Sequence, residues 1–167
     1  MSRGTSVPKI DKTAFVAPTA VVMGDVTLGP ESSVWYTSVL RGDMAPIVIG
    51  AQTNIQDGTI VHVDAGFPCT IGERCGVGHK AILHGCTVED ECLIGMGSIL
   101  LNGVRIGTGS VVAAGAVVPE GMQVPPGSLV MGVPGRIVRQ VTPELAERIT
   151  GTWQHYVDQA RDHRAGK

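Results

Sequence analysis

Three of the five histidines in this 167-residue chain, His62, His79 and His84, lie close together in the sequence. Three neutral imidazoles are a sufficient protein ligand set for a catalytic Zn²⁺ whose fourth position stays open for water. These residues therefore raise the hypothesis of a metal-dependent enzyme. Whether their side chains can meet depends on the elements that carry them.

Those elements follow from an aliphatic residue that recurs every six positions, apart from two short insertions and one deletion. The recurring residues are Ile10, Val16, Val22, Leu28, Val34, Leu40, Ile49, Ile55, Val61, Ile71, Val77, Leu83, Val88, Ile94, Leu100, Ile106, Val112, Val118, Val124 and Val130. A six-residue period fits neither a helix nor simple strand alternation, and it indicates a parallel β-helix. The alternative all-β fold is a β-sandwich of many short strands. Its strands would recur at irregular spacings of about 8 to 12 residues.

The period also sets the expected domain organisation. We expect residues 1–135 to form the hexapeptide-repeat β-helix and residues 142–163 to form a C-terminal helix that packs on it, all in one domain. Thr142 is a suitable N-cap and Pro143 a suitable first helical residue. An apolar stripe with helical spacing follows, at Leu145, Ile149, Trp153, Tyr156 and Ala160.

Charge and hydropathy narrow the classes of partner. The formal net charge is −2 and the sequence pI is about 6.2, which argues against nucleic acid or an anionic membrane surface as a partner. No run of about 18 apolar residues is present, as a membrane span would need. The first residues lack the apolar core of a signal peptide, so we expect a soluble, cytoplasmic protein.

The four cysteines fall at equivalent places of successive coils. Cys69 and Cys86 are three repeat units apart, as are Cys75 and Cys92, so each pair is expected to stack at a small inward position. Buried thiols in a reducing compartment are the simplest interpretation. Disulfides in an oxidising compartment remain an alternative.

Counting repeats places two of the histidines in one column. Leu40, Val61 and Leu83 are three units apart and are followed by Arg41, His62 and His84. Neighbouring coils are separated by about 4.8 Å, the spacing of paired strands, so His62 and His84 can share one ion.

His79 falls at a different corner. It lies two residues after Val77, one face earlier, and Asp57 holds the same place one coil below. Six extended residues cover up to about 20 Å, so His79 cannot complete the site within one chain. A shared site requires His79 from a neighbouring subunit, and three-fold closure is natural for triangular prisms set side by side.

Simpler interpretations exist for each of these residues. A single histidine at a corner is more often a solvent-facing polar residue than a ligand. Two stacked histidines would be partly protonated and repel each other near neutral pH, which favours a metal. Arg41 and Asp57 are expected to form an ion pair between subunits, while Asp43 alone could belong to a solvated pair worth under about 1 kcal/mol.

Several motifs together resemble the γ-class carbonic anhydrase family over nearly the whole chain. They are Leu40-Arg41-Gly42-Asp43, Asn54-Ile55-Gln56-Asp57-Gly58, His62-Val63-Asp64, Gly78-His79, Leu83-His84-Gly85-Cys86, Ile94-Gly95-Met96-Gly97 and Leu101-Asn102-Gly103. The resemblance implies a homotrimer of left-handed β-helices with one metal per subunit interface, usually Zn²⁺ with Fe²⁺ or Co²⁺ possible. It also implies a lyase that hydrates CO₂ reversibly to bicarbonate through a metal-bound hydroxide.

The resemblance assigns roles to individual residues. His62 and His84 of one chain and His79 of the next would be the metal ligands, and Arg41 and Asp43 the structural ion pair. The implied catalytic residues are Gln56, which would orient the hydroxide, Asp57 beside it, Tyr156 of the terminal helix, and Asn102.

The chain differs in one respect from the archetypal member of the γ-class carbonic anhydrase family. Two glutamates of the archetypal member are missing: Met44 follows Asp43, and the loop of residues 64–68 carries no Glu. Without such a proton shuttle, turnover is expected to be slow or to depend on buffer.

Three other functions remain open. A hexapeptide acyltransferase shares the segment from Pro126 to Val138 but uses one catalytic histidine and a pantetheine groove. An acyl-CoA thioester hydrolase is the second. The third is a non-enzymatic accessory protein, in which the metal only holds the trimer together.

Overall fold

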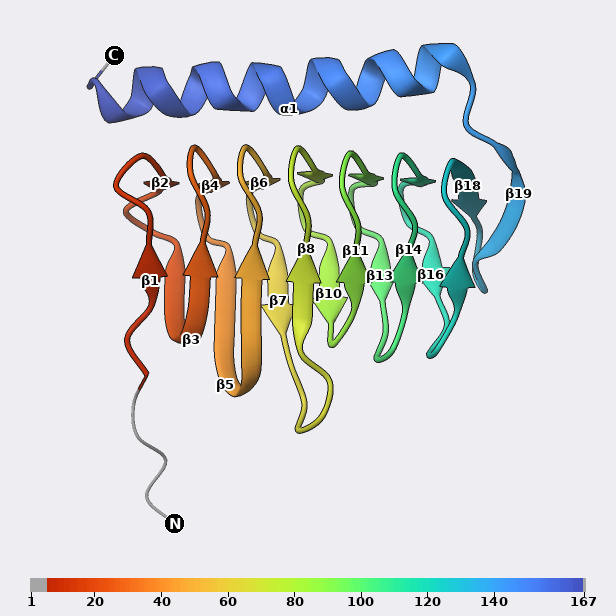
Figure 1. The fold of residues 1–167 in the computed structure, drawn as a ribbon, viewed down its shortest axis with the longest axis horizontal. Coiled ribbons are helices and arrows are strands. Elements are labelled where there is room, and N and C mark those ends of the chain that lie inside the picture. Colours follow the sequence, from red (N-terminus) through yellow and green to blue (C-terminus); the bar gives the residue numbers. More distant parts are fainter. Residues whose placement is uncertain (1–5, 167) are drawn as a thin grey trace.

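The computed structural model describes residues 6–166, which form a parallel β-solenoid with a helix after it (Figure 1). Residues 1–5 of the expected 1–135 domain lie outside the described range. The strands are β1 (Lys9–Ile10), β2 (Phe15–Val16), β3 (Val21–Leu28), β4 (Ser33–Val34), β5 (Val39–Ile49), β6 (Asn54–Ile55), β7 (Ile60–His62), β8 (Cys69–Ile71), β9 (Gly76–Val77), β10 (Ile82–His84), β11 (Thr87–Val88), β12 (Leu93–Ile94), β13 (Ile99–Leu100), β14 (Arg105–Ile106), β15 (Val111–Val112), β16 (Val117–Val118), β17 (Gln123–Val124), β18 (Ser128–Met131) and β19 (Arg136–Gln140). The helix is α1 (Pro143–Arg164).

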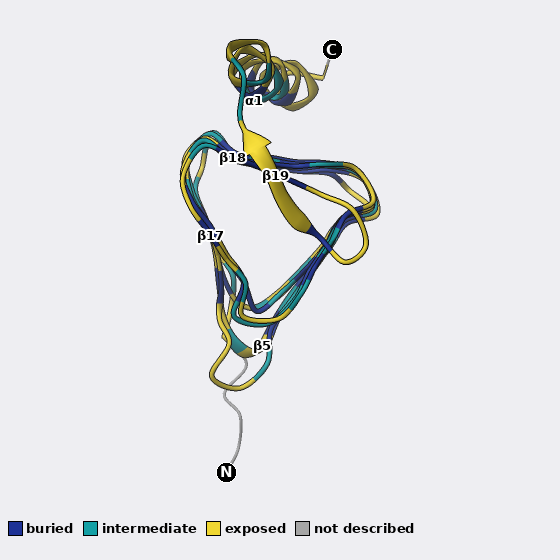
Figure 2. Cartoon of the chain, turned by 90° about the vertical axis from the view of Figure 1, so that its right-hand side faces the viewer, coloured by how far each residue is buried: buried dark blue, intermediate teal, exposed yellow. Residues whose placement is uncertain are grey.

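The strands lie on three faces of a triangular prism (Figure 2). Face 1 holds β7, β10, β13 and β16, together with the first parts of β3 and β5. Face 2 holds β1, β8, β11, β14 and β17, together with the second parts of β3 and β5. Face 3 holds β2, β4, β6, β9, β12, β15 and β18.

The hand of the solenoid can be followed in Figure 2, where the C-terminal end faces the viewer. The chain passes from β17 on the left face to β18 on the upper face, which is clockwise, while it advances toward the viewer. Clockwise advance toward the viewer is a left-handed coil. The parallel β-helix expected from the repeats is therefore confirmed, as is the left hand that the family resemblance implies.

The recurring aliphatic residues fill the interior. Leu40, Val61, Leu83 and Leu100 stack on face 1 and are fully buried, and the equivalent residues of the other faces join the same cluster. Close stacking also restricts the corners. A Cβ on Gly50 would lie 2.5 Å from the carbonyl carbon of Gly72, so this corner accepts only glycine.

One strand near the end of the solenoid has no counterpart in the repeat. β19 pairs antiparallel with β18 and carries the chain back toward face 3. The hexapeptide period stops at Val130, so it gives no signal for this strand. Its role is to deliver the chain to the start of α1.

α1 lies along face 3 (Figure 1). Thr142 caps its first turn through a hydrogen bond from the Leu145 N–H, as the sequence predicts. Ile149 packs against Val111 and Leu129, and Ala160 packs against Phe15 and Trp35. These contacts, together with that of Arg161 with Glu31, hold α1 along face 3.

Within residues 6–166, no helix is both long enough and apolar enough to cross a membrane.

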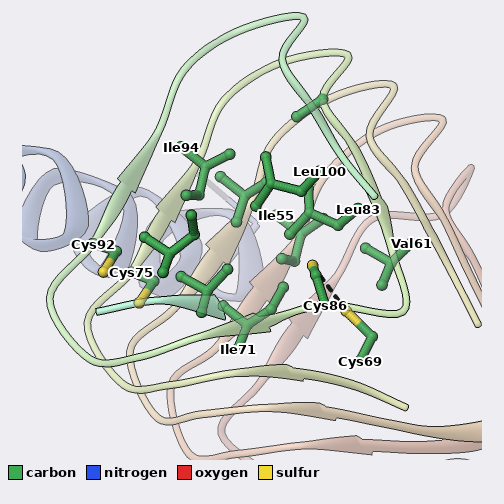
Figure 3. Close-up of a cluster of buried hydrophobic side chains, with 14 of the residues drawn as sticks. Ile55, Val61, Cys69, Ile71, Cys75, Leu83, Cys86, Cys92, Ile94 and Leu100 are labelled. Carbon is green, nitrogen blue, oxygen red and sulfur yellow. Dashed lines mark hydrogen bonds between the residues drawn. The ribbon is translucent and has the colours of Figure 1, made fainter. Parts of the chain in front are cut away.

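The four cysteines are buried free thiols at inward positions of adjacent coils (Figure 3). The sulfur atoms of Cys69 and Cys86 are 3.9 Å apart. A hydrogen bond with Cys69, together with burial, raises the pKa of Cys86 well above its ordinary value. A hydrogen bond with Cys92, together with burial, does the same for Cys75.

We expect these thiols to be inert in the folded protein, because attack on a disulfide reagent requires an exposed thiolate. Ellman's reagent should label none of the cysteines of the native protein and all of them after unfolding in guanidinium. A Thr70→Cys variant, which places a thiol on the exposed side of face 2, is the positive control. Rapid labelling of the unmodified native protein would contradict the buried arrangement.

Candidate metal centre

Two histidines end neighbouring strands at the corner between faces 1 and 2. β7 ends at His62 and β10 ends at His84, and the two residues are direct partners in the parallel register. Their ring centroids are 4.9 Å apart, and His62 Nδ1 lies 2.9 Å from His84 Nε2. The hexapeptide register thus brings two imidazole nitrogens together.

The other nitrogen of each ring faces an acceptor. His62 Nε2 lies 3.1 Å from Asp43 Oδ1, and His84 Nδ1 lies 2.7 Å from Asn102 Oδ1. Carboxylate and amide oxygens only accept hydrogen bonds, so both rings donate outward. Asp43 is also paired with Arg41, as the resemblance implies.

Asp43 is held as a carboxylate. Desolvation raises its pKa, but hydrogen bonds from Arg41 and His62 lower it more, so the pKa of Asp43 lies below its ordinary value. The carboxylate on the outer side of His62 fixes the orientation of that ring.

The inner nitrogens form a donor pair that needs a cation. If both rings are neutral, each uses its single N–H outward and two lone pairs face each other across 2.9 Å. A proton shared between the two nitrogens or a bound metal ion would remove that repulsion. Two nitrogens bound to one tetrahedral Zn²⁺ at its usual ligand distance would be about 3.3 Å apart. The pair therefore fits a metal ion, which would relieve the repulsion between the lone pairs.

His79 lies at the other edge of face 1, just after β9. Its Nδ1 is 3.0 Å from Asp57 Oδ2, and its Nε2 is 3.4 Å from the Tyr156 hydroxyl. Its side chain is 42% exposed, whereas that of His62 is 18% exposed. The carboxylate of Asp57 accepts from Nδ1, so Nε2 is the nitrogen available to a ligand.

Tyr156 reaches His79 because α1 packs on face 3. Its ring lies edge-on to Trp35, with centroids 5.2 Å apart. Burial raises the pKa of Tyr156, and the nearby charge of Asp57 adds to this effect. The phenol is therefore a neutral hydrogen-bond group at physiological pH.

Gln56 belongs to the same corner as His79. It is only 5% exposed, and its Nε2 donates to Asn54 Oδ1 at 3.0 Å. Of the residues to which the resemblance gives a role, His79, Gln56, Asp57 and Tyr156 therefore gather at one corner, and His62, His84, Asn102, Arg41 and Asp43 gather at the other.

No three His, Cys, Asp or Glu side chains in the described part of the chain converge on one point as metal ligands would. The structure brings His62 and His84 together and leaves His79 across face 1 from them. Within the chain, Arg41 pairs with Asp43 and Asp57 contacts His79, and the ion pair expected between Arg41 and Asp57 of different subunits stays a prediction.

Face 1, which separates the two corners, exposes an unbroken apolar column. Its outward residues, stacked in register, are Val21, Val39, Ile60, Ile82, Ile99 and Val117. The equivalent column on face 2 is Lys9, Thr27, Val48, Thr70, Thr87, Arg105 and Gln123, which is mostly polar. Face 3 is covered by α1, so face 1 is the apolar face that no element within residues 6–166 covers.

Asp64 contributes to the site although sequence reasoning gave it no role. Its Oδ2 accepts a hydrogen bond from Asn102 Nδ2 at 3.0 Å, and Asn102 in turn contacts His84. Asp64 lies in an insertion, where the repeat count no longer predicts position. The one signal in the sequence was its place two residues after His62.

A cavity of about 430 Å³ opens beside His79, between the edge of face 3 and α1. Its walls are mainly apolar and include Leu93, Met96, Met131 and Leu145, and Arg148 also lines it. The cavity can accept an apolar group next to His79.

Comparison with known proteins finds relatives that share the hexapeptide repeat and relatives named carbonic anhydrase. A family model described as bacterial transferase hexapeptide (six repeats) matches residues 85–120. The chain is 46% identical over 148 residues to a protein of Methanocaldococcus jannaschii named probable carbonic anhydrase, and the match covers 89% of this chain and 93% of that protein. It is 45% identical over 164 residues to gamma carbonic anhydrase 1, mitochondrial, of Arabidopsis thaliana, with coverage of 95% and 60%.

The chain thus spans less than two thirds of the length of the plant relative. Among solved structures, a hexapeptide transferase family protein from Anaplasma phagocytophilum superposes with a TM-score of 0.89 at 38% identity, covering 93% of this chain and 92% of that one.

The environment of Tyr156 predicts its titration. Because the pKa of Tyr156 is raised, its phenol should stay protonated as the pH rises past about 10, the ordinary value for tyrosine. Ultraviolet absorbance of tyrosinate should show one phenol that ionises late, and Tyr156→Phe should remove it. Tyr36→Phe, which changes the other tyrosine, is the control and should leave the late phenol in place. Loss of that signal in the Tyr36 variant would show that the wrong tyrosine was assigned.

Proposed function

Because the chain belongs to the γ-class carbonic anhydrase family, we propose that it hydrates CO₂ reversibly to bicarbonate at a metal site completed by a second copy of itself. The observation that carries the proposal is the division of the three histidines between the two edges of one uncovered apolar face. A single chain offers two ligands at one edge and the third at the other.

The assembly follows from this division. If the His79 edge of one copy meets the His62 edge of the next, the contact joins two different surfaces, and such a contact forms a closed ring or an open filament. Three triangular prisms with face 1 turned inward close such a ring. The apolar column of face 1 is then buried around the ring axis, so we propose a homotrimer with one site at each of its interfaces.

The proposed ligands are His62 and His84 of one copy and His79 of the next. Zn²⁺ is the proposed ion, with Fe²⁺ and Co²⁺ as alternatives. When bound, such an ion acts as a Lewis acid that lowers the pKa of water to about 7. The three neutral imidazoles leave its charge uncompensated.

Other residues of the chain prepare the site. Asp43 and Asn102 hold the outer nitrogens of His62 and His84, and Asp57 holds Nδ1 of His79, so all three rings present a lone pair. Gln56 and Tyr156 lie on the His79 side, where their polar groups can orient water or bicarbonate.

Proton release to solvent is the step for which the chain lacks the glutamates of the archetypal family member. Asp57, whose side chain is 41% exposed, is the carboxylate beside His79 that has access to solvent. With Met44 after Asp43 and no glutamate in the loop of residues 64–68, we propose that Asp57 and the buffer carry the proton. We also propose a cytoplasmic location, with no nucleic acid or membrane partner.

A second candidate function is transfer or hydrolysis of an acyl thioester. The apolar cavity beside His79 favours it, because an acyl chain could lie there next to the proposed site. The purified, metal-loaded protein should therefore be assayed with an acyl-CoA substrate as well as with CO₂. Turnover of the thioester without CO₂ hydration would favour this candidate.

Mixed trimers test the shared site directly. His79→Ala and His62→Ala homotrimers should each bind no metal and hydrate no CO₂, because every interface lacks a ligand. Trimers that contain both variants, isolated with two different affinity tags, have one interface with all three histidines. They should regain about one third of the metal and of the stopped-flow CO₂ hydration rate per trimer.

The outcomes of this experiment are distinct. Failure of the mixed trimers to regain metal would overturn the shared site. Recovery of about one third of the metal without CO₂ hydration above the buffer blank would instead favour a thioester enzyme or an accessory protein in which the metal only holds the trimer together.

The proposed interface has its own test. Ile82→Glu places a carboxylate in the middle of the face 1 column and should convert the trimer to monomers, as seen by sedimentation or light scattering, because the charge would be buried without a partner. Val48→Glu is the matched control, since Val48 is 39% exposed on face 2 and Ile82 is 38% exposed on face 1. An unchanged trimer in the Ile82 variant, or equal disruption by both, would place the interface elsewhere.

A further inference from the structure

We propose that Asp64 and Asn102 form a hydrogen-bond relay that fixes His84 in the tautomer with its proton on Nδ1. This leaves the lone pair of Nε2 directed at the proposed metal position. The inference rests on the proposed role of His84 as a ligand. It makes Asn102, to which the resemblance gave a catalytic role, a positioning residue, and it adds Asp64 to the site.

The relay follows from what each group can donate. Asp64 Oδ2 is 3.0 Å from Asn102 Nδ2, and an ionised carboxylate only accepts, so the amide nitrogen must face Asp64. The amide oxygen is then turned toward His84 Nδ1, at 2.7 Å. Because that oxygen only accepts, His84 must carry its proton on Nδ1.

Gly85 makes room for the relay. A Cβ on Gly85 would overlap Asn102 Oδ1 and lie 2.7 Å from Phe67 Cβ, and the backbone here has a φ of +55°, which favours glycine. Phe67 belongs to the loop that carries Asp64, and its N–H donates to the Asp64 carbonyl at 2.9 Å. The loop is therefore closed over Asn102 at a corner where Gly85 has no side chain.

The relay differs from the partner of His62 in the placement of charge. Asp43 contacts His62 directly, whereas on the His84 side the carboxylate of Asp64 is separated from the ring by a neutral amide. The amide orients the ring through its oxygen and keeps a second negative charge away from the ligands. Less of the charge of a bound cation is then neutralised by the protein.

Nuclear magnetic resonance of the ¹⁵N-labelled imidazoles, recorded on the metal-free chelated protein at mildly alkaline pH, reads the tautomer directly. The wild-type protein should show the His84 proton on Nδ1. Asp64→Asn is nearly isosteric but can donate as well as accept, so the Asn102 amide loses its fixed orientation and His84 should show both tautomers. Asn102→Leu should do the same.

Zinc affinity gives a second readout. Loss of a partner that orients a metal-ligating histidine typically weakens metal binding by about 10- to 100-fold, and we expect this for Asp64→Asn and Asn102→Leu. Asn102→Asp, which keeps an acceptor against Nδ1, should retain the tautomer. Asp158→Asn, a change on the exposed side of α1, is the matched control and should alter neither readout.

The outcomes separate this inference from the proposed function. A wild-type His84 with its proton on Nε2, or an Asp64→Asn variant with an unchanged tautomer, overturns the relay. If the tautomer responds as expected but the wild-type protein binds no zinc, the relay stands and the proposed metal function falls.

Discussion

The register between successive coils is the constraint on which the rest of the structure depends. Parallel pairing at the strand spacing places equivalent residues of the repeat directly above one another, so each position becomes a column along the prism. An aliphatic column fills the interior, and a histidine column follows it by one residue. A slip of one residue between β7 and β10 would separate the two imidazoles and also turn buried residues outward. Core packing therefore enforces the geometry of the donor pair.

This dependence explains which parts could be predicted from the sequence. The period fixes positions on the prism without knowledge of side-chain contacts, so it gave the fold, the stacked cysteines, the column of His62 and His84, and the separate corner of His79. α1 was predictable for a different reason, because its cap and apolar stripe are local signals. The register that carries these predictions is present in the structure, whereas the metal roles of the histidines remain predictions.

The parts that could not be predicted lie where the period is broken. β19 reverses direction after the last repeat, and no spacing announces an antiparallel strand there. The contact between Asp64 and Asn102 depends on how an inserted loop folds back over Gly85, which is a matter of side-chain packing. The repeat count also places charges only to the nearest corner. It could not show that, within the chain, Asp57 contacts His79 and Arg41 contacts Asp43.

The chain also holds two arrangements that are unfavourable in isolation. A column of β-branched side chains faces solvent on face 1, and two imidazole nitrogens, whose rings both donate outward, are held 2.9 Å apart. Each would be relieved by a different event, the first by burial against another copy and the second by binding a cation. Both lie at the same face, so one assembly step that covers the column also brings a His79 edge to the donor pair. A site divided in this way cannot hold its full ligand set before the subunits meet, and on this proposal assembly and metal binding stabilise each other through the same surface.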